Sequence, residues 1–252
     1  MYLVKLKIFL IKFCSKFYFS RRSKVIFYHD IHSEKKYSSM STSLDLFKQH
    51  ITIIKNEGYE IVSEIKSKYG QIEICFDDGF LGLYDNINFI NKNNIPIHLF
   101  IITSCFDIEN FINKDKLIEL SKYNNLKISS HTHSHSDFIN FTDNQIETDF
   151  KQSKNILEKI IGKSVNSLCY PLGYHNNKTN NIANKIGFKN LYSCIPGFFK
   201  LDNCKIINRS LVQFAAKDEF TAIIKGGDHS LSTKANLKRI ISELNKIVSN
   251  VF

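Results

Sequence analysis

The chain has 252 residues, 43% hydrophobic and 23% charged, which is ordinary for a globular protein able to bury a sizeable core. Three prolines and ten glycines argue against a disordered or linker-rich chain. The formal net charge of +10 comes from lysines spread along the sequence, without zinc-finger spacing, a recognition helix or an aromatic RNA-binding motif, so we do not expect a nucleic-acid partner. Six cysteines without short spacings favour a reducing compartment over a disulfide framework.

Residues 1–20 combine apolar residues with four lysines, namely Lys5, Lys7, Lys12 and Lys16. These charges interrupt both a membrane span and the apolar region of a signal peptide. We therefore expect a basic amphipathic helix at a membrane surface, on a protein that is cytoplasmic and peripheral to the inner membrane face. A helix packed on the domain and an uncleaved export signal are the alternatives.

Residues 21–252 alternate between strand-like and helix-like segments. Strands are predicted at 25–30, 72–76, 97–103, 126–130, 166–170 and 205–214. Helices are predicted at 43–57, 83–94, 115–123, 142–161, 177–186, 217–225 and 233–250. This alternation, without a linker or internal repeat, predicts a single α/β domain with a parallel sheet, and about seven repeats favour closure into a barrel.

Polar side chains follow several of the predicted strands. His29 and Asp30, Asp77 and Asp78, the segment 131–135, and the turn 171–173 all come directly after a strand. In a parallel α/β barrel the carboxyl ends of the strands meet at one rim, where functional groups gather. Adjacent carboxylates repel, so Asp77 and Asp78 need a nearby cation or a shared proton. Because side chains alternate along a strand, one of them can bind a metal while the other handles a proton.

His131 and His135 can converge on one ion from a compact loop. One carboxylate with two imidazoles suits zinc or another first-row divalent metal, with positions left open for water and substrate. Such an ion lowers the pKa of bound water to about 7, and a second carboxylate beside it can act as general base.

Three motifs in order resemble the polysaccharide deacetylase family, also called the NodB-homology family or carbohydrate esterase family 4. Phe76-Asp77-Asp78-Gly79-Phe80 is similar to its first motif, His131-Thr132-His133-Ser134-His135 to its second, and Tyr170-Pro171-Leu172-Gly173 to its third. The resemblance covers roughly residues 24–214, including Tyr28-His29 in the first strand.

The resemblance implies an irregular (β/α)₇ barrel that removes an acyl group, typically N-acetyl, from an amino sugar in a glycan or glycan precursor. It implies Asp78, His131 and His135 as ligands of a divalent metal, with Zn²⁺ the expected ion, and Asp77 as general base. The backbone N–H of Leu172 would stabilise the oxyanion. Substrate contacts are expected from Tyr170, Pro171, Gly173 and His29.

The chain also departs from the family pattern. Cys169 stands where the family often has an arginine that orients the base, so Asp77 must be held another way; Arg209 could meet a carboxylate or lie at the surface. The late motif, a leucine two residues before a histidine general acid, is poorly matched, and His229 is the candidate as the last histidine of the chain. We expect His98 to be packed and hydrogen-bonded and His133 to be structural.

Two other functions stay open at this point. One is a non-catalytic carbohydrate-binding or assembly subunit that retains the metal site, although Asp77 argues against it because binding alone needs no base. The other is a hydrolase of a formamide or another non-sugar amide.

Overall fold

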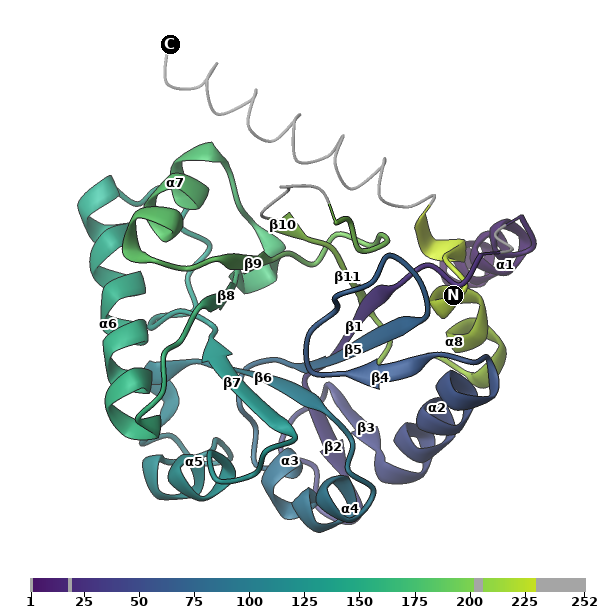
Figure 1. The fold of residues 1–252 in the computed structure, drawn as a ribbon, viewed down its shortest axis with the longest axis horizontal. Coiled ribbons are helices and arrows are strands. Elements are labelled where there is room, and N and C mark those ends of the chain that lie inside the picture. Colours follow the sequence, from purple (N-terminus) through teal and green to yellow (C-terminus); the bar gives the residue numbers. More distant parts are fainter. Residues whose placement is uncertain (1, 18–19, 202–205, 230–252) are drawn as a thin grey trace.

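The computed structural model describes residues 2–17, 20–201 and 206–229 and shows a parallel sheet surrounded by helices (Figure 1). The strands of the main sheet, in hydrogen-bonding order, are β10 (Ile206–Ile207), β9 (Asn190–Tyr192), β8 (Ser167–Cys169), β7 (Leu126–Ser130), β6 (Ile97–Ile101), β5 (Gln71–Phe76), β1 (Lys24–Tyr28) and β11 (Arg209–Leu211). Only Asn208 separates β10 from β11, so one run of chain pairs with β9 on one side and β1 on the other. The predicted (β/α)₇ barrel is confirmed.

Helices cover the outer face of the barrel (Figure 1). They are α1 (Tyr2–Ser15), α2 (Leu44–Asn56), α3 (Gly82–Asp85), α4 (Ile87–Lys92), α5 (Lys114–Leu120), α6 (Asp143–Ile161), α7 (Asn177–Ile186) and α8 (Lys217–Ile224). Three short 3₁₀ turns are present among the described residues: η1 (Thr103–Cys105) after β6, η2 (Pro171–Gly173) after β8 and η3 (Gly227–His229) after α8. β4 (Glu60–Val62) pairs with the start of β5, and β2 (Asp30–His32) pairs with β3 (Ser41–Ser43) in a small second sheet.

Local chemistry defines the ends of the longest helices. The Thr142 side chain accepts a hydrogen bond from the backbone of Gln145, whose side chain in turn caps Thr142, so α6 begins with a capping box. It ends at Gly162, whose φ of 65° is the left-handed conformation that glycine adopts most easily. Asn176 and Thr179 form the same kind of box at the start of α7. These two helices match the predicted segments closely.

Other predicted elements differ in detail. The helix expected over 83–94 is divided into α3 and α4 at Asn86, and the strand expected over 97–103 ends at Ile101. β2, β3, β4 and β9 were not predicted, because three residues are too few to show a periodicity. The helix predicted at 233–250 lies outside the described residues.

The two faces of β5 explain the two parts of the core. Its even-numbered residues 72, 74 and 76 belong to the large apolar cluster between sheet and helices. The odd-numbered side chains face the barrel interior, because side chains alternate along a strand. This inward row consists of Glu73, Cys75 and, just past the strand, Asp77.

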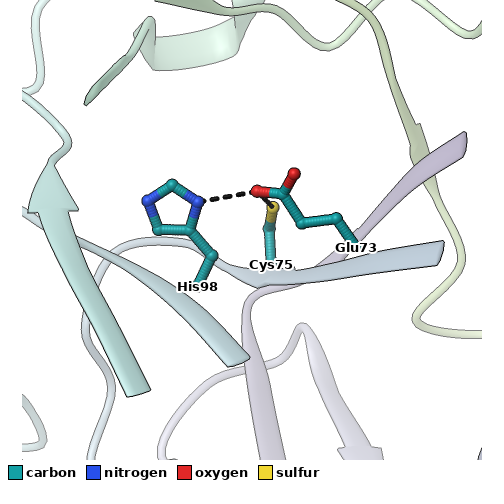
Figure 2. A group of neighbouring side chains, drawn as sticks. All are labelled: Glu73, Cys75 and His98. Carbon is teal, nitrogen blue, oxygen red and sulfur yellow. Dashed lines mark hydrogen bonds and ion pairs between the residues drawn. The ribbon is translucent and has the colours of Figure 1, made fainter. Parts of the chain in front are cut away.

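The middle of the barrel interior holds a buried polar network (Figure 2). His98 Nδ1 lies 2.7 Å from Glu73 Oε1, and its Nε2 lies 2.8 Å from Ser129 Oγ. The Tyr192 hydroxyl donates to the same Glu73 oxygen at 2.9 Å, and Cys75 Sγ lies 3.9 Å from it. The expectation of a packed, hydrogen-bonded His98 is confirmed.

Candidate active site

The carboxyl ends of the parallel strands bring the predicted residues to one rim. Asp77 follows β5 directly and donates its backbone N–H to Tyr28 O at the end of β1, at 2.9 Å. His131 follows β7 and donates its backbone N–H to Ile101 O at the end of β6, at 2.9 Å. Segments far apart in sequence therefore meet because neighbouring strands run in parallel register.

Asp78 lies between two imidazoles. Its Oδ1 atom is 3.3 Å from His131 Nε2 and 3.5 Å from His135 Nε2, and no hydrogen-bond partner reaches this buried oxygen within the described residues. The ligand atoms of the three residues all lie within 4.8 Å of one another. The structure thus brings together the three residues predicted to bind a metal.

The orientation of His131 leaves one ring nitrogen directed at Asp78. Its Nδ1 lies 2.9 Å from the backbone oxygen of Cys169, so Nδ1 carries the proton and Nε2 keeps its lone pair. A backbone carbonyl on the far nitrogen is a common way to orient a metal-binding histidine. Burial lowers the pKa of His131, but Asp78 and Asp77 outweigh it and raise the pKa overall. His135 has a lowered pKa because of its burial and the neighbouring His131.

The loop that carries both histidines is fixed by α6. The Asp149 carboxylate accepts the backbone N–H groups of His133 at 2.8 Å and Ser134 at 3.0 Å. Thr132 has a left-handed φ of 70°, and its hydroxyl accepts the backbone N–H of His135 at 3.1 Å. The His133 ring hydrogen-bonds to Thr103 at 2.9 Å, away from the metal ligands. The structural role expected for His133 agrees with this contact, whereas no sequence pattern indicated the role of Asp149.

Arg209 holds the predicted general base. It lies on β11, is fully buried, and binds the two carboxylate oxygens of Asp77 through Nη1 and Nη2, both at 2.7 Å. Its Nε donates to Ser193 O at 2.9 Å, and its guanidinium lies 4.3 Å from the centre of the Phe27 ring. The surface alternative for Arg209 is therefore wrong, because this side chain meets a protein carboxylate in the interior.

The pair explains how Asp77 stays ionised. Burial alone would raise the pKa of the Asp77 carboxyl, but the charge of Arg209, followed by that of His131, outweighs burial and holds the pKa well below its usual range. The bidentate geometry also fixes the carboxylate plane. Cys169 stands at the position where the family often has an arginine, and its Sγ lies 2.8 Å from Arg209 Nη2. The guanidinium from β11 therefore replaces the arginine that is missing at position 169.

His29 stands on the same rim. Its Nδ1 lies 2.6 Å from Oε1 of Gln213, a buried residue just after β11. Charge on His29 lowers the pKa values of both Asp77 and Asp78, so the three residues share one electrostatic environment. Gln213 comes two residues after Leu211, the spacing at which the family has its late histidine. A search for a leucine two residues before any polar side chain near 205–214 would have found it.

His229 lies at the other end of the barrel. It follows Asp228, whose carboxylate binds Lys24 Nζ at 2.6 Å, and its ring lies 5.1 Å from that of Phe198. Lys24 opens β1, whereas Asp77 meets Tyr28 at the far end of that strand, roughly 13 Å away at 3.3 Å per residue. The prediction of His229 as general acid is therefore wrong for this fold.

The turn after β8 exposes only one of its four motif residues. Leu172 has a left-handed φ of 56° and is 65% exposed, while Pro171 and Gly173 are buried. The Tyr170 side chain is fully buried and donates to Asn180 Oδ1 at 2.9 Å, so it is not available to a substrate, contrary to expectation. A Cβ on Gly173 would lie 2.5 Å from Cys194 N, which excludes a larger residue there.

Comparisons with known proteins agree with this geometry. The model of the polysaccharide deacetylase family matches residues 65–191, about half of the chain. The chain belongs to this family. It is 22% identical over 184 residues to Bacillus subtilis YxkH, whose name assigns it provisionally to the polysaccharide deacetylases. That match covers 69% of this chain and 64% of the relative's length.

Solved structures show the same fold. The Streptococcus pyogenes deacetylase PplD, in complex with acetate, superposes with a TM-score of 0.70 at 20% identity, covering 80% of this chain and 96% of that chain. IcaB from Ammonifex degensii superposes with a TM-score of 0.72 at 18% identity, covering 81% and 97%. At these identities the likeness establishes the barrel and not the substrate.

Proposed function

We propose that this protein is a metal-dependent deacetylase that removes an acyl group, most simply N-acetyl, from an amino sugar in a glycan or glycan precursor. Family membership supports the reaction class. The observation that carries the proposal is the buried Asp78 Oδ1, which lies between two imidazole nitrogens without a hydrogen-bond partner among the described residues, beside an ionised Asp77. A site for carbohydrate binding alone would not need this second carboxylate.

Asp78, His131 and His135 fit a divalent cation. One carboxylate oxygen and two neutral imidazoles suit Zn²⁺, and the separations of 3.3 and 3.5 Å between Asp78 Oδ1 and the two ring nitrogens match those of neighbouring ligands of one ion. A bound cation would lower the pKa of water and polarise the acyl carbonyl. It would also neutralise the buried Asp78 charge, which has no hydrogen bond on Oδ1.

Asp77 is the proposed general base. Its carboxylate is fixed by Arg209 on the barrel interior side and takes the proton from the attacking water. The low pKa keeps the carboxylate ionised, so it is ready to accept a proton across the physiological pH range.

We assign proton donation to the leaving amine to His29. Gln213 Oε1 accepts Nδ1–H of this ring, which leaves Nε2 as the nitrogen that can exchange a proton at the rim. A fixed tautomer of this kind is what a general acid requires. The backbone N–H of Leu172, on an exposed left-handed turn beside Cys169, is the proposed oxyanion donor.

The test combines metal analysis with two activity assays. Acetate release is measured on N-acetylated amino sugars and oligosaccharides, and formate release is measured on simple formamides. Purified protein should hold about one equivalent of zinc and release acetate from a sugar substrate. Asp77→Asn should keep the metal and lose activity. Binding of an oligosaccharide that is unchanged in this variant, with no acetate released by the wild type, would support a carbohydrate-binding subunit instead.

A further inference from the structure

Helix α1 carries its apolar side chains on the outside of the protein. Ile11 is buried where α1 contacts α8 and η3. Five large apolar residues, which we call the aromatic stripe, are instead exposed: Leu6, Phe9, Leu10, Phe13 and Phe17. Phe9 is 63% and Phe17 65% exposed. A surface helix normally buries its apolar side and exposes a polar one, as α2 does with Phe47 buried, whereas α1 is apolar on its exposed side as well.

The stripe is continuous along the helix. The four members within α1 recur at helical spacing, and at 100° per residue they fall within an arc of roughly 100°, while Phe17 follows in the turn after the helix. The Phe9 and Phe13 rings are stacked with centroids 6.4 Å apart, and Phe13 meets Phe17 edge to face at 5.3 Å. A contiguous exposed apolar surface of this kind marks an interaction site rather than scattered exposure.

Lysines flank the stripe on both sides. Lys5, Lys12 and Lys16 follow one edge of the helix and Lys7 follows the other, on the same wheel that defines the stripe. Lys12 forms an ion pair with Asp218 of α8 at 3.2 Å. An apolar stripe with lysines along its edges matches the interface of an anionic bilayer, where rings enter the acyl boundary and ammonium groups meet phosphates.

A basic cleft lies at the end of the same helix. It has a volume of about 420 Å³ and is lined by Ser15, Lys16, Ser20, Arg21, Glu57, Tyr59 and Lys225. Its one carboxylate, Glu57, is paired with Lys225 at 2.8 Å, so Lys16 and Arg21 leave the cleft positive. Arg21 is held in place by a hydrogen bond from Nη1 to Gly58 O at 2.9 Å. A phosphate group suits these donors.

We propose that α1 docks this protein on an anionic lipid surface, with the aromatic stripe in the interfacial region and a lipid phosphate in the basic cleft. The contact is peripheral, since no helix among the described residues is long and apolar enough to cross a membrane. The proposal does not depend on the deacetylase activity, and its test is independent of it. α1 leads into the amino end of β1, so docking through it leaves the catalytic rim at the opposite end of the strands uncovered.

The experiment is vesicle sedimentation of the full chain with vesicles of phosphatidylcholine alone or mixed with phosphatidylglycerol. Wild type should sediment with the anionic vesicles and much less with the neutral ones, and added salt should release it. The variant Phe9→Ser/Phe13→Ser/Phe17→Ser should lose at least about tenfold in partitioning. Lys5→Gln, Lys7→Gln and Lys16→Gln should each cost about fivefold on anionic vesicles only.

The matched control is Ile118→Ser on α5, which removes an exposed apolar side chain far from α1 and should bind like the wild type. Equal sedimentation of the wild type and the triple phenylalanine variant would overturn the proposal. Light scattering that shows a dimer for the wild type and a monomer for the triple variant would also overturn it, because a second copy of the chain would then occupy the stripe. A wild type that does not sediment with the anionic vesicles would also overturn it.

Discussion

Two clusters of carboxylate and histidine side chains lie along β5, and they differ in the distance between the carboxylate oxygen and the imidazole nitrogens. At the rim, Asp78 Oδ1 is 3.3 and 3.5 Å from two imidazole nitrogens and has no hydrogen-bond partner in the part of the chain that the structure describes. In the interior, Glu73 Oε1 is 2.7 Å from His98 (Figure 2). The distances around Asp78 leave room for a cation, while the distance between Glu73 and His98 is that of a hydrogen bond.

The hydrogen bonds of the histidine ring nitrogens also distinguish the rim cluster from the interior cluster. His131 uses only Nδ1 on the protein, so Nε2 keeps a lone pair for a metal. His98 uses both nitrogens, one on Glu73 and one on Ser129, so a neutral ring has no lone pair left. Burial also raises the pKa of the nearby Cys75 thiol, which keeps it protonated and a poor ligand. Carboxylate and imidazole groups therefore occur in both clusters, but only the geometry at the rim suits a bound cation.

The largest expected effect comes from the rim ligands. Asp78→Ala or His131→Ala should remove the bound metal and lower activity by about 10³-fold or more, because the ion would supply several kcal/mol of transition-state stabilisation. Elemental analysis and acetate release measure both. His133→Ala, in the same loop but bonded to Thr103, is the matched control and should keep most of its metal. Full metal content in Asp78→Ala would break the comparison.

Removing Arg209 tests how the base is held. Arg209→Met leaves the buried Asp77 carboxylate unpaired and should lower the free energy of unfolding by about 3–5 kcal/mol. In the wild type the depressed pKa of Asp77 contributes stability above its unfolded value of about 3.9, and this contribution is lost as the pH falls below that value. In the variant burial is opposed only by the weaker influence of His131 and His29, so the pKa of Asp77 should rise and the acidic limb of the pH–activity profile should move to higher pH.

Arg209→Met/Asp77→Asn is the control for that experiment, since it removes the unpaired charge and should recover much of the lost stability. Denaturant unfolding compares the two variants. If the single and double variants were equally unstable, the cost would come from lost packing on Phe27 rather than from the charge.

Two histidines at opposite ends of β1 can be compared directly. His29→Gln should lower kcat by about 10²–10³-fold, because general acid catalysis contributes about that much, while metal content stays the same. His229→Gln should leave kcat nearly unchanged, since this residue lies at the amino end of the strand. Steady-state kinetics distinguish them, and the reverse ranking would restore His229 as the general acid.

The smallest effect is expected in the interior cluster. His98→Leu removes a donor from the buried Glu73 and should lower the free energy of unfolding by about 1–3 kcal/mol without changing the metal content. Glu73→Gln, which keeps an acceptor for Tyr192, is a milder variant and should cost less. A loss of one metal equivalent in His98→Leu would show that the interior cluster also binds an ion.

The sequence by itself determined the elements whose signals are local. The capped helix α6, the helix α7 and strand β7 follow from periodicity, capping residues and glycine stops that act within one turn or one strand. The three motifs indicated the family, which the family model confirms, and predicted that Asp78, His131 and His135 lie together, because these residues follow strand ends whose position a parallel barrel dictates. Very short strands such as β9 gave too few residues to read.

Only the tertiary structure decided which distant residues meet. The Asp77–Arg209 pair joins two strands that are far apart in sequence, and nothing near Arg209 distinguishes a buried guanidinium from an exposed one. The same holds for Gln213 against His29, and for His229, whose place depends on where η3 packs. The pattern of apolar and polar residues predicts which face of its own helix or strand a side chain occupies. Which residue it contacts on that face depends on how the sheet closes.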